Sequence, residues 1–305
     1  MKIKKRTGKD DYGSLITNVG KVRAVSLYFI AVLAATVLIT VAIFPLAYPL
    51  LNLIPGVANY PGDRILSRLV LLAIFSVTFV IYPRLKLPPL GLWRPGQRGW
   101  RAGLKGMALG MLAVVLFLGY TAAAHGGTVE FYRFSPAGSP AALFIWYLVG
   151  VITVAVIEET FFRGIAFNLF HRDTNSVGAA VIISALFFAV VHFINWPDLV
   201  AGCQNGAGWR QFLPALAAGT DMAKFLILFL LGAVLAYAYR RSGTLYAAIG
   251  IHAGLVLMIR IAGKVFVRGD GGLFNIFRLN RLDIVVVAAI LAGIALLLPR
   301  IFPRH

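Results

Sequence analysis

Residues 148–170 read LVGVITVAVIEETFFRGIAFNLF. Apart from Glu158, Glu159 and Arg163, none of these side chains carries a charge. An α-helix needs about 20 mostly apolar residues to cross the ~30 Å hydrocarbon core of a bilayer. The stretch also lacks the alternation of apolar and polar residues that marks membrane β-strands. It therefore predicts a membrane-spanning helix that carries charged side chains within it.

The rest of the chain has the same character. Apolar residues make up 60% of the 305 residues and charged residues only 13%, whereas soluble domains contain about 25% charged residues. Because these apolar runs favour helices over barrel strands, we expect an all-α fold, a polytopic transmembrane bundle of about eight helices. The expected spans are Ala24–Phe44, Arg68–Tyr82, Gly106–Ala124, Leu148–Phe170, Gly178–Trp196, Phe225–Tyr239, Leu245–Met258 and Asp283–Leu298.

The lysine and arginine residues predict the orientation of the bundle. If the N-terminus is cytoplasmic, most of the 29 Lys and Arg residues fall on the cytoplasmic side, as the positive-inside rule requires. We therefore expect both termini in the cytoplasm. Arg260, Lys264, Arg268, Arg278 and Arg281 are the exception, because they gather on the opposite side. Either that loop re-enters the membrane or the last span is placed wrongly.

The formal net charge of +18 raises the question of nucleic-acid binding. The cations flank apolar spans, which is typical of contacts with anionic lipid headgroups, so we expect the lipid bilayer and no nucleic acid as a partner. Cys203 is the only cysteine. The chain can therefore form neither an internal disulfide nor a cysteine-based metal site.

The adjacent carboxylates Glu158 and Glu159 are the first candidate functional residues. A single charged residue at the centre of a membrane helix costs about 2.5–3.5 kcal/mol on insertion scales. Glu159 and Arg163 are four residues apart, so they share a helix face and can neutralise each other. Glu158 is rotated by about 100° from Glu159 and has no partner on its own helix. It is therefore a candidate general base, although all three residues could instead only tie helices together.

Two histidines in later apolar spans add to this group. Ser184, Phe188 and His192 fall on one helix face, because residues four apart lie above one another. His252 lies in a third span. Counted at ~1.5 Å per residue from the expected membrane boundary, the depths of His192, His252 and Glu158 overlap. We therefore expect three helices to bring these side chains together around one wet pocket.

These residues resemble the CAAX-processing and bacteriocin-processing (Abi, CPBP) family of glutamic intramembrane proteases. The family pattern is Glu-Glu-x-x-x-Arg, then Phe-x-x-x-His, then a motif like His-x-x-x-Asn, each on its own membrane helix. The matching residues are Glu158, Glu159, Arg163, Phe188, His192 and His252. Val256 stands where the family commonly has Asn. The resemblance covers roughly residues 146–258.

The resemblance implies hydrolysis of a peptide bond by water, without a metal or another cofactor. Glu158, helped by His192, would take a proton from the attacking water. Glu159 and Arg163 would hold the catalytic helix and set the local field. His252 would donate to the oxyanion; because Val256 cannot donate a hydrogen bond, activity could be reduced or lost.

Substrate and location are also implied by the resemblance. Phe188 and Asn195 are expected near the substrate, and Asn195 or a backbone amide is a candidate replacement for the missing donor. The substrate would be a membrane-anchored or lipidated protein, and the location a bacterial inner or plasma membrane. The expected regions are a cytoplasmic tail (1–23), N-terminal transmembrane helices (24–140), a CAAX-protease-like catalytic core (141–260), and a C-terminal loop with the last transmembrane helix (261–305).

The same residues are compatible with three other hypotheses. Glu158, His192 and His252 could ligate a catalytic zinc ion, although no His-Glu-x-x-His sequence is present. A serine mechanism is disfavoured, because Ser184 lies about two turns, or ~12 Å, from His192 along the helix. A non-catalytic binding protein, scaffold or transporter could use buried Glu and His side chains to bind a cation or relay protons.

Overall fold

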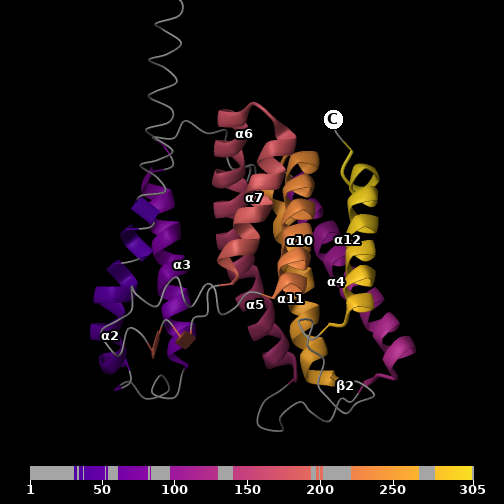
Figure 1. Cartoon of the computed structure of the whole chain (residues 1–305), viewed down its shortest axis with the longest axis horizontal. Helices are drawn as coiled ribbons and strands as arrows, with labels where there is room; N and C mark the ends of the chain where they lie inside the picture. The colour runs from indigo at the N-terminus through magenta and orange to yellow at the C-terminus, as the bar shows by residue number, and fades with distance from the viewer. Residues whose placement is uncertain are drawn as a thin grey trace, which may run out of the picture. The chain divides into compact units, whose positions relative to one another are not determined.

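The computed structural model describes residues 31–32, 34–36, 38–51, 53, 61–81, 83, 97–129, 140–193, 197–198, 200–201, 221–267 and 279–303. Most of these residues lie in helices (Figure 1), which confirms the predicted all-α fold. The chain divides into two compact units. Residues 1–87, 169–175 and 195–215 form the first unit, and the remaining residues form the second.

The first unit is built from short and long apolar helices. Its elements are η1 (Ile39–Ile43), α2 (Phe44–Leu51), α3 (Gly62–Ile81) and most of α6 (Asn168–Thr174). Phe44 is fully buried and its ring stacks on that of Tyr48. None of the side chains that resemble the protease motifs lies in this unit.

The second unit is a helical bundle arranged around one central helix. Its helices are α4 (Gln97–His125), α5 (Pro140–Glu159), η4 (Thr160–Phe167), α7 (Val177–Val191), α10 (Met222–Ser242), α11 (Leu245–Val265) and α12 (Arg281–Ile301). α11 packs against α4, α5 and α10, while α7 packs against α10 and η4 (Figure 1). α11 is also the most deeply buried of the long helices. Side chains on α11 therefore face neighbours from several directions.

Capping groups fix where the helices of the second unit begin and end. Side-chain oxygens of Ser176, Asp221 and Thr244 accept backbone N–H groups at the starts of α7, α10 and α11, the preferred chemistry for a helix N-terminus. Gly243 ends α10 with a φ of 66°, a left-handed conformation that glycine adopts without steric cost. α10 and α11 are therefore joined by a tight turn.

Glycines allow α4 and α11 to pack with almost no space between them. A Cβ atom at Gly106 or Gly110 would overlap the backbone of α11, and one at Gly250 or Gly254 would overlap the backbone of α4. Small residues permit this close approach of membrane helices. Gly106 and Gly110 therefore let α4 lie directly against α11, the helix that carries His252.

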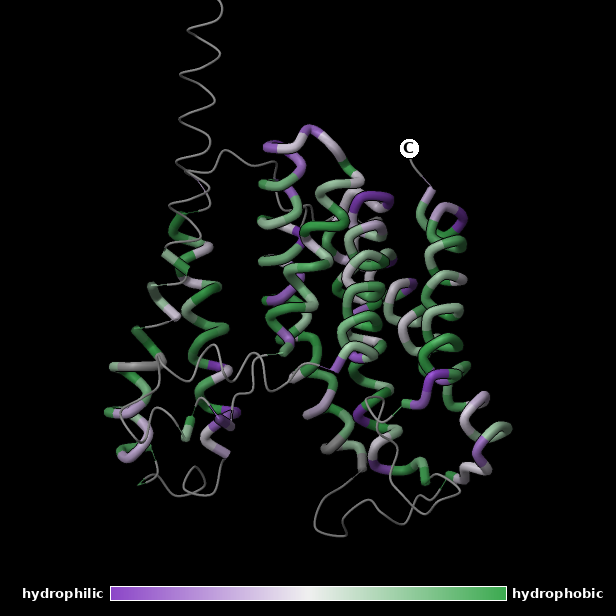
Figure 2. The backbone as a smooth tube through the Cα atoms, in the orientation of Figure 1, coloured by the Kyte–Doolittle hydropathy of each residue, from purple (hydrophilic) through white to green (hydrophobic). Residues whose placement is uncertain are grey.

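Six helices in the described part of the chain are long and apolar enough to cross a membrane. They are Gly62–Ile81, Gly99–His125, Phe144–Thr174, Met222–Ser242, Leu245–Val265 and Arg281–Ile301, and apolar residues run along them (Figure 2). The predicted span Ala24–Phe44 lies partly outside the described residues. The predicted span Gly178–Trp196 overlaps α7, which has only 15 residues. The polytopic bundle is thus confirmed, with six of the eight spans found as long helices.

The end of the seventh predicted span was wrong. α11 continues past Met258 to Val265, so Arg260 and Lys264 lie on this helix rather than in a loop. Long basic side chains tolerate such positions, because their apolar stems can lie along the helix while the charge reaches polar surroundings. Arg260 and Lys264, two of the five cations expected on the side opposite the cytoplasm, therefore lie on the same helix as His252.

The end of the bundle where α11 ends and α12 begins is tied together by polar contacts. β1 (Thr128–Val129) pairs antiparallel with β2 (Phe266–Val267). Asp283 at the start of α12 accepts hydrogen bonds from Nε2 of His125 at 2.9 Å and from the Tyr120 hydroxyl at 3.2 Å. Both partners lie on α4. The three helices α4, α11 and α12 are therefore fixed to one another at this end.

Candidate active site

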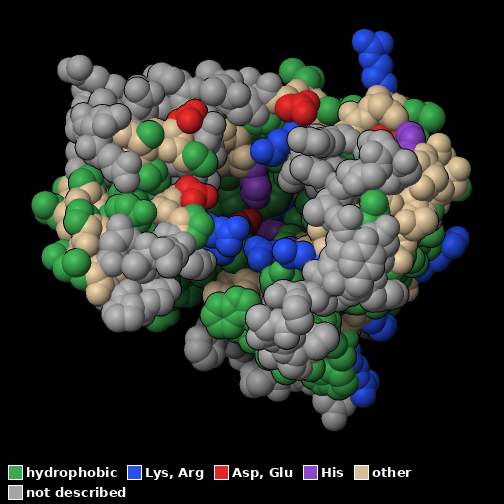
Figure 3. All heavy atoms as spheres, turned by 90° about the horizontal axis from the view of Figure 1, so that it is seen from below, with side chains coloured by type: hydrophobic (Ala, Val, Ile, Leu, Met, Phe, Trp, Pro, Cys, Tyr) green, Lys and Arg blue, Asp and Glu red, His purple; other side chains and the backbone are tan. Residues whose placement is uncertain are grey.

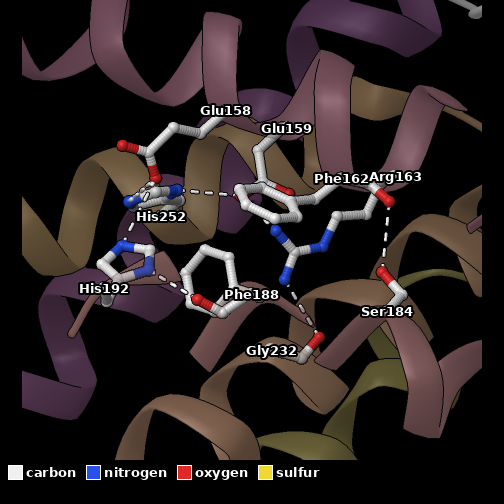
Figure 4. Close-up of polar contacts among 9 residues, drawn as sticks. All are labelled: Glu158, Glu159, Phe162, Arg163, Ser184, Phe188, His192, Gly232 and His252. Atoms are coloured by element: carbon white, nitrogen blue, oxygen red, sulfur yellow. Dashed lines mark hydrogen bonds and ion pairs between the residues drawn. The ribbon is translucent and has the colours of Figure 1, made fainter. Parts of the chain in front are cut away.

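The two adjacent carboxylates lie where an α-helix changes into a π-helix. Glu158 and Glu159 end α5, and Arg163 lies in the eight-residue π-helix η4 that follows. Nη1 of Arg163 donates to Oε1 of Glu159 at 2.9 Å, and both side chains are fully buried. The predicted i to i+4 ion pair is therefore present (Figure 4). π-Helical turns within α-helices are frequent at functional sites.

Arg163 is held from three sides. Its Nη2 atom donates to the carbonyl oxygen of Gly232 on α10 at 3.0 Å. The guanidinium carbon lies 4.5 Å from the ring centre of Phe188 and 5.6 Å from that of Phe162. A desolvated cation gains about 2 kcal/mol or more from such a ring. These contacts stabilise a charge that would otherwise be costly in an apolar bundle.

Gly232 was not predicted from the sequence. A Cβ atom there would lie 3.0 Å from the backbone of Ala185 on α7, so glycine lets α10 and α7 approach closely. Its carbonyl oxygen thereby comes within reach of Arg163. The residue lies 69 positions from Arg163 in the chain, and a glycine in an apolar span gives no signal that distinguishes this contact from ordinary helix packing.

His252 bridges the two carboxylates. Its Nδ1 atom lies 2.8 Å from Oε1 of Glu159; because a carboxylate only accepts, the imidazole donates from Nδ1. Its Nε2 atom lies 3.9 Å from Oε2 of Glu158. Glu159 therefore accepts from both Arg163 and His252 on one oxygen, and the orientation of the His252 ring is fixed by that bond.

His192 approaches Glu158 from the end of α7. The helix ends at Val191 and His192 is its C-cap. Nδ1 of His192 donates to the carbonyl oxygen of Phe188 at 2.7 Å, since a carbonyl oxygen can only accept. In a neutral ring the other nitrogen, Nε2, is then the acceptor, and it lies 3.6 Å from Oε2 of Glu158.

The Oε2 atom of Glu158 is the point at which the group converges. It is buried and has no hydrogen-bond partner among the described residues. Separations of 3.6 Å and 3.9 Å from two imidazole nitrogens exceed a direct hydrogen bond but suit a bridging water molecule. The side chains of Glu158 and His192 are 15% and 29% exposed, against 6% for His252. Glu158 and His192 are therefore the more exposed members of the cluster.

The remaining candidate residues have different positions. Phe188 is buried, and its ring lies between Arg163, His192 and His252, so a substrate contact by this residue stays a prediction. Ser184 is buried and donates to a backbone carbonyl oxygen of η4 at 3.1 Å. Asn195 and Cys203 lie outside the described residues.

No group of three or more His, Cys, Asp or Glu side chains is arranged to hold a metal ion within the part of the chain that the structure describes. Among the described residues, the motif side chains contact one another through hydrogen bonds and ion pairs. That the protein works without a metal ion stays a prediction.

The molecule is hollowed at the end of the bundle at which α11 ends and α12 begins (Figure 3). Seen from that end, histidine side chains are visible in the depth of the molecule, with lysine and arginine side chains near them (Figure 3). α7 also ends, and α10 begins, on this side of the cluster (Figure 1).

Comparison with known proteins identifies the segment that carries this cluster. Residues 140–258 match the family described as type II CAAX prenyl endopeptidase Rce1-like. This segment is similar to the Rce1-like family. The resemblance predicted from the three motifs is thus confirmed, and the Rce1-like segment contains every member of the cluster. The match supports an intramembrane protease of the CAAX type.

A bacterial relative extends the comparison. The chain is 29% identical over 171 residues to the uncharacterized protein YyaK of Bacillus subtilis (strain 168). The alignment covers 51% of this chain and 50% of the relative, so the chain spans about half the length of the curated relative it matches. No solved structure matches the chain.

Proposed function

We propose that the protein is an intramembrane endopeptidase of the glutamic type, in which Glu158 and His192 activate a water molecule. The position of Glu158 Oε2, 3.6 Å and 3.9 Å from the Nε2 atoms of two histidines, carries this proposal. A water molecule between Glu158 and His192 can donate one hydrogen bond to each. Two bases acting on one water molecule make it a stronger nucleophile than water in bulk.

The chemical steps follow from these contacts. The water gives a proton to Glu158 while its oxygen forms a bond with the carbonyl carbon of the scissile peptide. The carbonyl oxygen becomes an oxyanion as the double bond opens. Glu158 then passes its proton to the peptide nitrogen as the carbon–nitrogen bond breaks. The products are a carboxylic acid and an amine, and the carboxylate is regenerated.

The His252 imidazole is the proposed donor to the oxyanion. Its Nδ1 proton is committed to Glu159, so Nε2 can donate only when the ring carries both protons. Glu158, Glu159 and Arg163 together carry one excess negative charge when both histidines are neutral. One proton on a histidine makes the cluster neutral, which lowers the cost of holding it away from water.

Glu159 and Arg163 are proposed as positioning residues. Glu159 orients His252 through Nδ1 and anchors Arg163, and Arg163 connects this pair to α10 through Gly232. Neither side chain is exposed, so neither is available to touch a substrate. Their role is to hold the donor ring and the helix of Glu158 in fixed positions.

We propose that the reaction needs no metal ion. Zinc bound by Glu158, His192 and His252 is the alternative, because this ligand set suits catalytic zinc. Metal analysis of active purified protein, together with activity after treatment with a chelator, distinguishes the metal-free mechanism from a zinc mechanism. Less than about one zinc ion per ten chains with full activity excludes a stoichiometric zinc site.

The proposed substrate is a membrane-anchored or lipidated protein, because the cluster lies within apolar helices. The proposed location is a bacterial inner or plasma membrane with both termini in the cytoplasm. Lipid is the expected surrounding, and no nucleic acid is expected to bind. This assignment also explains why so few charged residues are present along the helices.

The function is tested by comparing membrane-protein termini in cells that carry the wild-type protein, no protein, Glu158→Gln or His192→Ala. The same uncut termini should appear in the deletion strain and in both variants, and they would identify the substrate. Normal insertion and a normal melting temperature of each purified variant are the controls. If the deletion alone changes the termini, the carboxylate is not catalytic and a non-catalytic membrane protein explains the fold better.

A further inference from the structure

Three consecutive carbonyl oxygens of η4 accept hydrogen bonds from side chains. Oγ of Ser184 on α7 donates to Phe162 at 3.1 Å. Nδ2 of Asn168, the residue that ends η4, donates to Arg163 at 3.1 Å and to Gly164 at 2.8 Å. A π-helix of eight residues is rare, and these donors stabilise the backbone that forms it.

Asn168 also connects η4 to α10. Its Nδ2 atom lies 2.9 Å from the hydroxyl oxygen of Tyr239, 71 positions further along the chain. The two backbone carbonyl oxygens can only accept, so the nitrogen of the amide must face them, and the Tyr239 hydroxyl accepts from it as well. The ring of Tyr239 packs edge-on against that of Phe167 at a centroid distance of 5.6 Å. Tyr239 therefore contacts the end of η4 through both its hydroxyl group and its ring.

α10 thus holds η4 at two points on one of its faces. Gly232 accepts from Nη2 of Arg163 at 3.0 Å (Figure 4), and Tyr239 binds Asn168. Gly232 and Tyr239 are seven residues apart, which places them on the same side of α10 and about 10 Å apart along it. Two attachment points fix the position of η4 and also its rotation about its own axis.

Tyr239 also packs on the apolar core that α5 and α11 share. This core contains Ala155 of α5 and Ala253 of α11. Ala155 lies about one turn before Glu158, and Ala253 directly follows His252 in the sequence. The residue that binds Asn168 is therefore packed against the same core as the helices of the proposed base and of the proposed oxyanion donor.

We propose that Asn168 and Tyr239 are positioning residues, which keep η4 π-helical and so fix the orientation of Arg163 relative to Glu158. This inference rests on the proposed function, because it concerns the placement of the proposed base. The pair lies away from the hollowed end, since α10 begins at that end and Tyr239 lies in its last turn (Figure 1). The two residues act on the reaction through the backbone of η4 rather than by contact with a substrate.

Rewinding of η4 would change the hydrogen bond between Glu159 and His252. An α-helix has fewer residues per turn than a π-helix, so the rewinding would rotate Arg163 relative to Glu159. Arg163 and Nδ1 of His252 share the Oε1 atom of Glu159. The proton on Nδ1 of His252 therefore reports on the form of η4, and it does so without turnover.

NMR of the full-length protein in nanodiscs, with isotope-labelled histidine, tests the inference. The chain has five histidines, and the signal that is lost in His252→Gln is that of His252. Tyr239→Phe, which removes the hydroxyl group and keeps the ring, should shift the Nδ1 signal of His252. Asn168→Leu, which has a similar shape and no donor, should shift it further. Tyr120→Phe is the matched control, because its hydroxyl group joins α4 to α12, and it should leave the signal in place.

Kinetics distinguishes positioning from a general loss of stability. With the substrate identified from cellular termini, Tyr239→Phe should lower kcat about three- to tenfold, the worth of one neutral hydrogen bond, and leave KM unchanged. In the Asn168→Leu protein the same change should have no further effect, because the hydrogen-bond partner is already gone. Tyr120→Phe should lower the melting temperature but not kcat.

Two outcomes would overturn the inference. An unmoved His252 signal in both the Tyr239→Phe and the Asn168→Leu protein would show that η4 keeps its form without this pair. Equal falls in kcat for Tyr239→Phe and Tyr120→Phe would show that the loss of activity comes from lower stability. Full activity of Glu158→Gln would instead overturn the proposed function, and the His252 signal would still test the role of the pair.

Discussion

The Oε1 atom of Glu159 lies 2.8 Å from Nδ1 of His252, and the same oxygen accepts a hydrogen bond from Arg163 at 2.9 Å. Glu158, the neighbouring residue, has no hydrogen bond on its buried Oε2 atom within the described chain. Two adjacent carboxylates thus have different surroundings. The Glu159 side chain is fully buried and accepts two donors on Oε1, whereas the Glu158 side chain is 15% exposed.

This difference predicts that two matched variants differ in melting temperature, although both lose activity. Glu159→Gln leaves the buried guanidinium of Arg163 without its counter-charge, and removing one partner of a buried ion pair costs about 3–5 kcal/mol. We expect a clear fall in the melting temperature of the purified protein together with loss of activity. Differential scanning fluorimetry in detergent measures the melting temperature directly.

Glu158→Gln is the internal control for that experiment. It removes a carboxylate whose buried oxygen makes no direct hydrogen bond to the described residues, so the melting temperature should stay close to that of the wild type while turnover is lost. Equal destabilisation by the two variants would show that both carboxylates are structural, and the assignment of Glu158 as the base would be abandoned.

The sequence was sufficient for the outline of this site. Apolar runs predicted the helices, the four-residue spacing predicted the pair of Glu159 and Arg163, and overlapping depths predicted that His192 and His252 approach Glu158. These predictions succeed because a membrane helix has a fixed rise and period. Side-chain depth can then be calculated from the sequence alone.

Other features depended on contacts that no local pattern reveals. The π-helical turn at Arg163 was not predicted, because the composition of the segment is that of an ordinary apolar helix. The bond from His252 to Glu159 depends on the rotation of α11. The end of α11 was missed because hydropathy falls at Arg260, although the helix continues to Val265.

The close contact between α4 and α11 predicts a strong effect of adding a single methyl group. Gly254 faces α4 on the side of α11 opposite His252, and a Cβ there would overlap the backbone at Met107. Gly254→Ala should push α11 away from α4 and move His252, with an overpacking cost of about 1–3 kcal/mol. Activity and melting temperature should both fall.

Gly119→Ala is the matched change on α4, since a Cβ there meets nothing within 4 Å. It should be neutral or stabilise the helix by about 0.5–1 kcal/mol. If Gly254→Ala behaved like Gly119→Ala, the tight crossing of α4 and α11 would have no part in holding His252.

The position of Phe188 predicts a change in kcat rather than in KM. Its ring packs on Arg163 at 4.5 Å and on His192 at a centroid distance of 4.3 Å. Phe188→Leu keeps an apolar side chain but removes the aromatic face, which is worth about 2 kcal/mol to a desolvated cation. We expect lower kcat with little change in KM, measured with the substrate identified from cellular termini. A raised KM with unchanged kcat would instead show that Phe188 binds the substrate.

Replacing Val256 with Asn is predicted to raise the activity of the protein. It lies one turn beyond His252 on α11 and packs against the apolar cluster that contains Val151 and Ala155 of α5. The related proteases commonly have Asn at this position, and one oxyanion donor is worth about 10²–10³ in kcat. Val256→Asn should therefore raise kcat by about tenfold or more, with a small loss of stability from placing an amide in an apolar contact. Val256→Ile, which keeps a branched apolar side chain and adds no hydrogen-bond donor, is the control. Equal rates for both variants and the wild type would show that the protein completes its oxyanion site without this position.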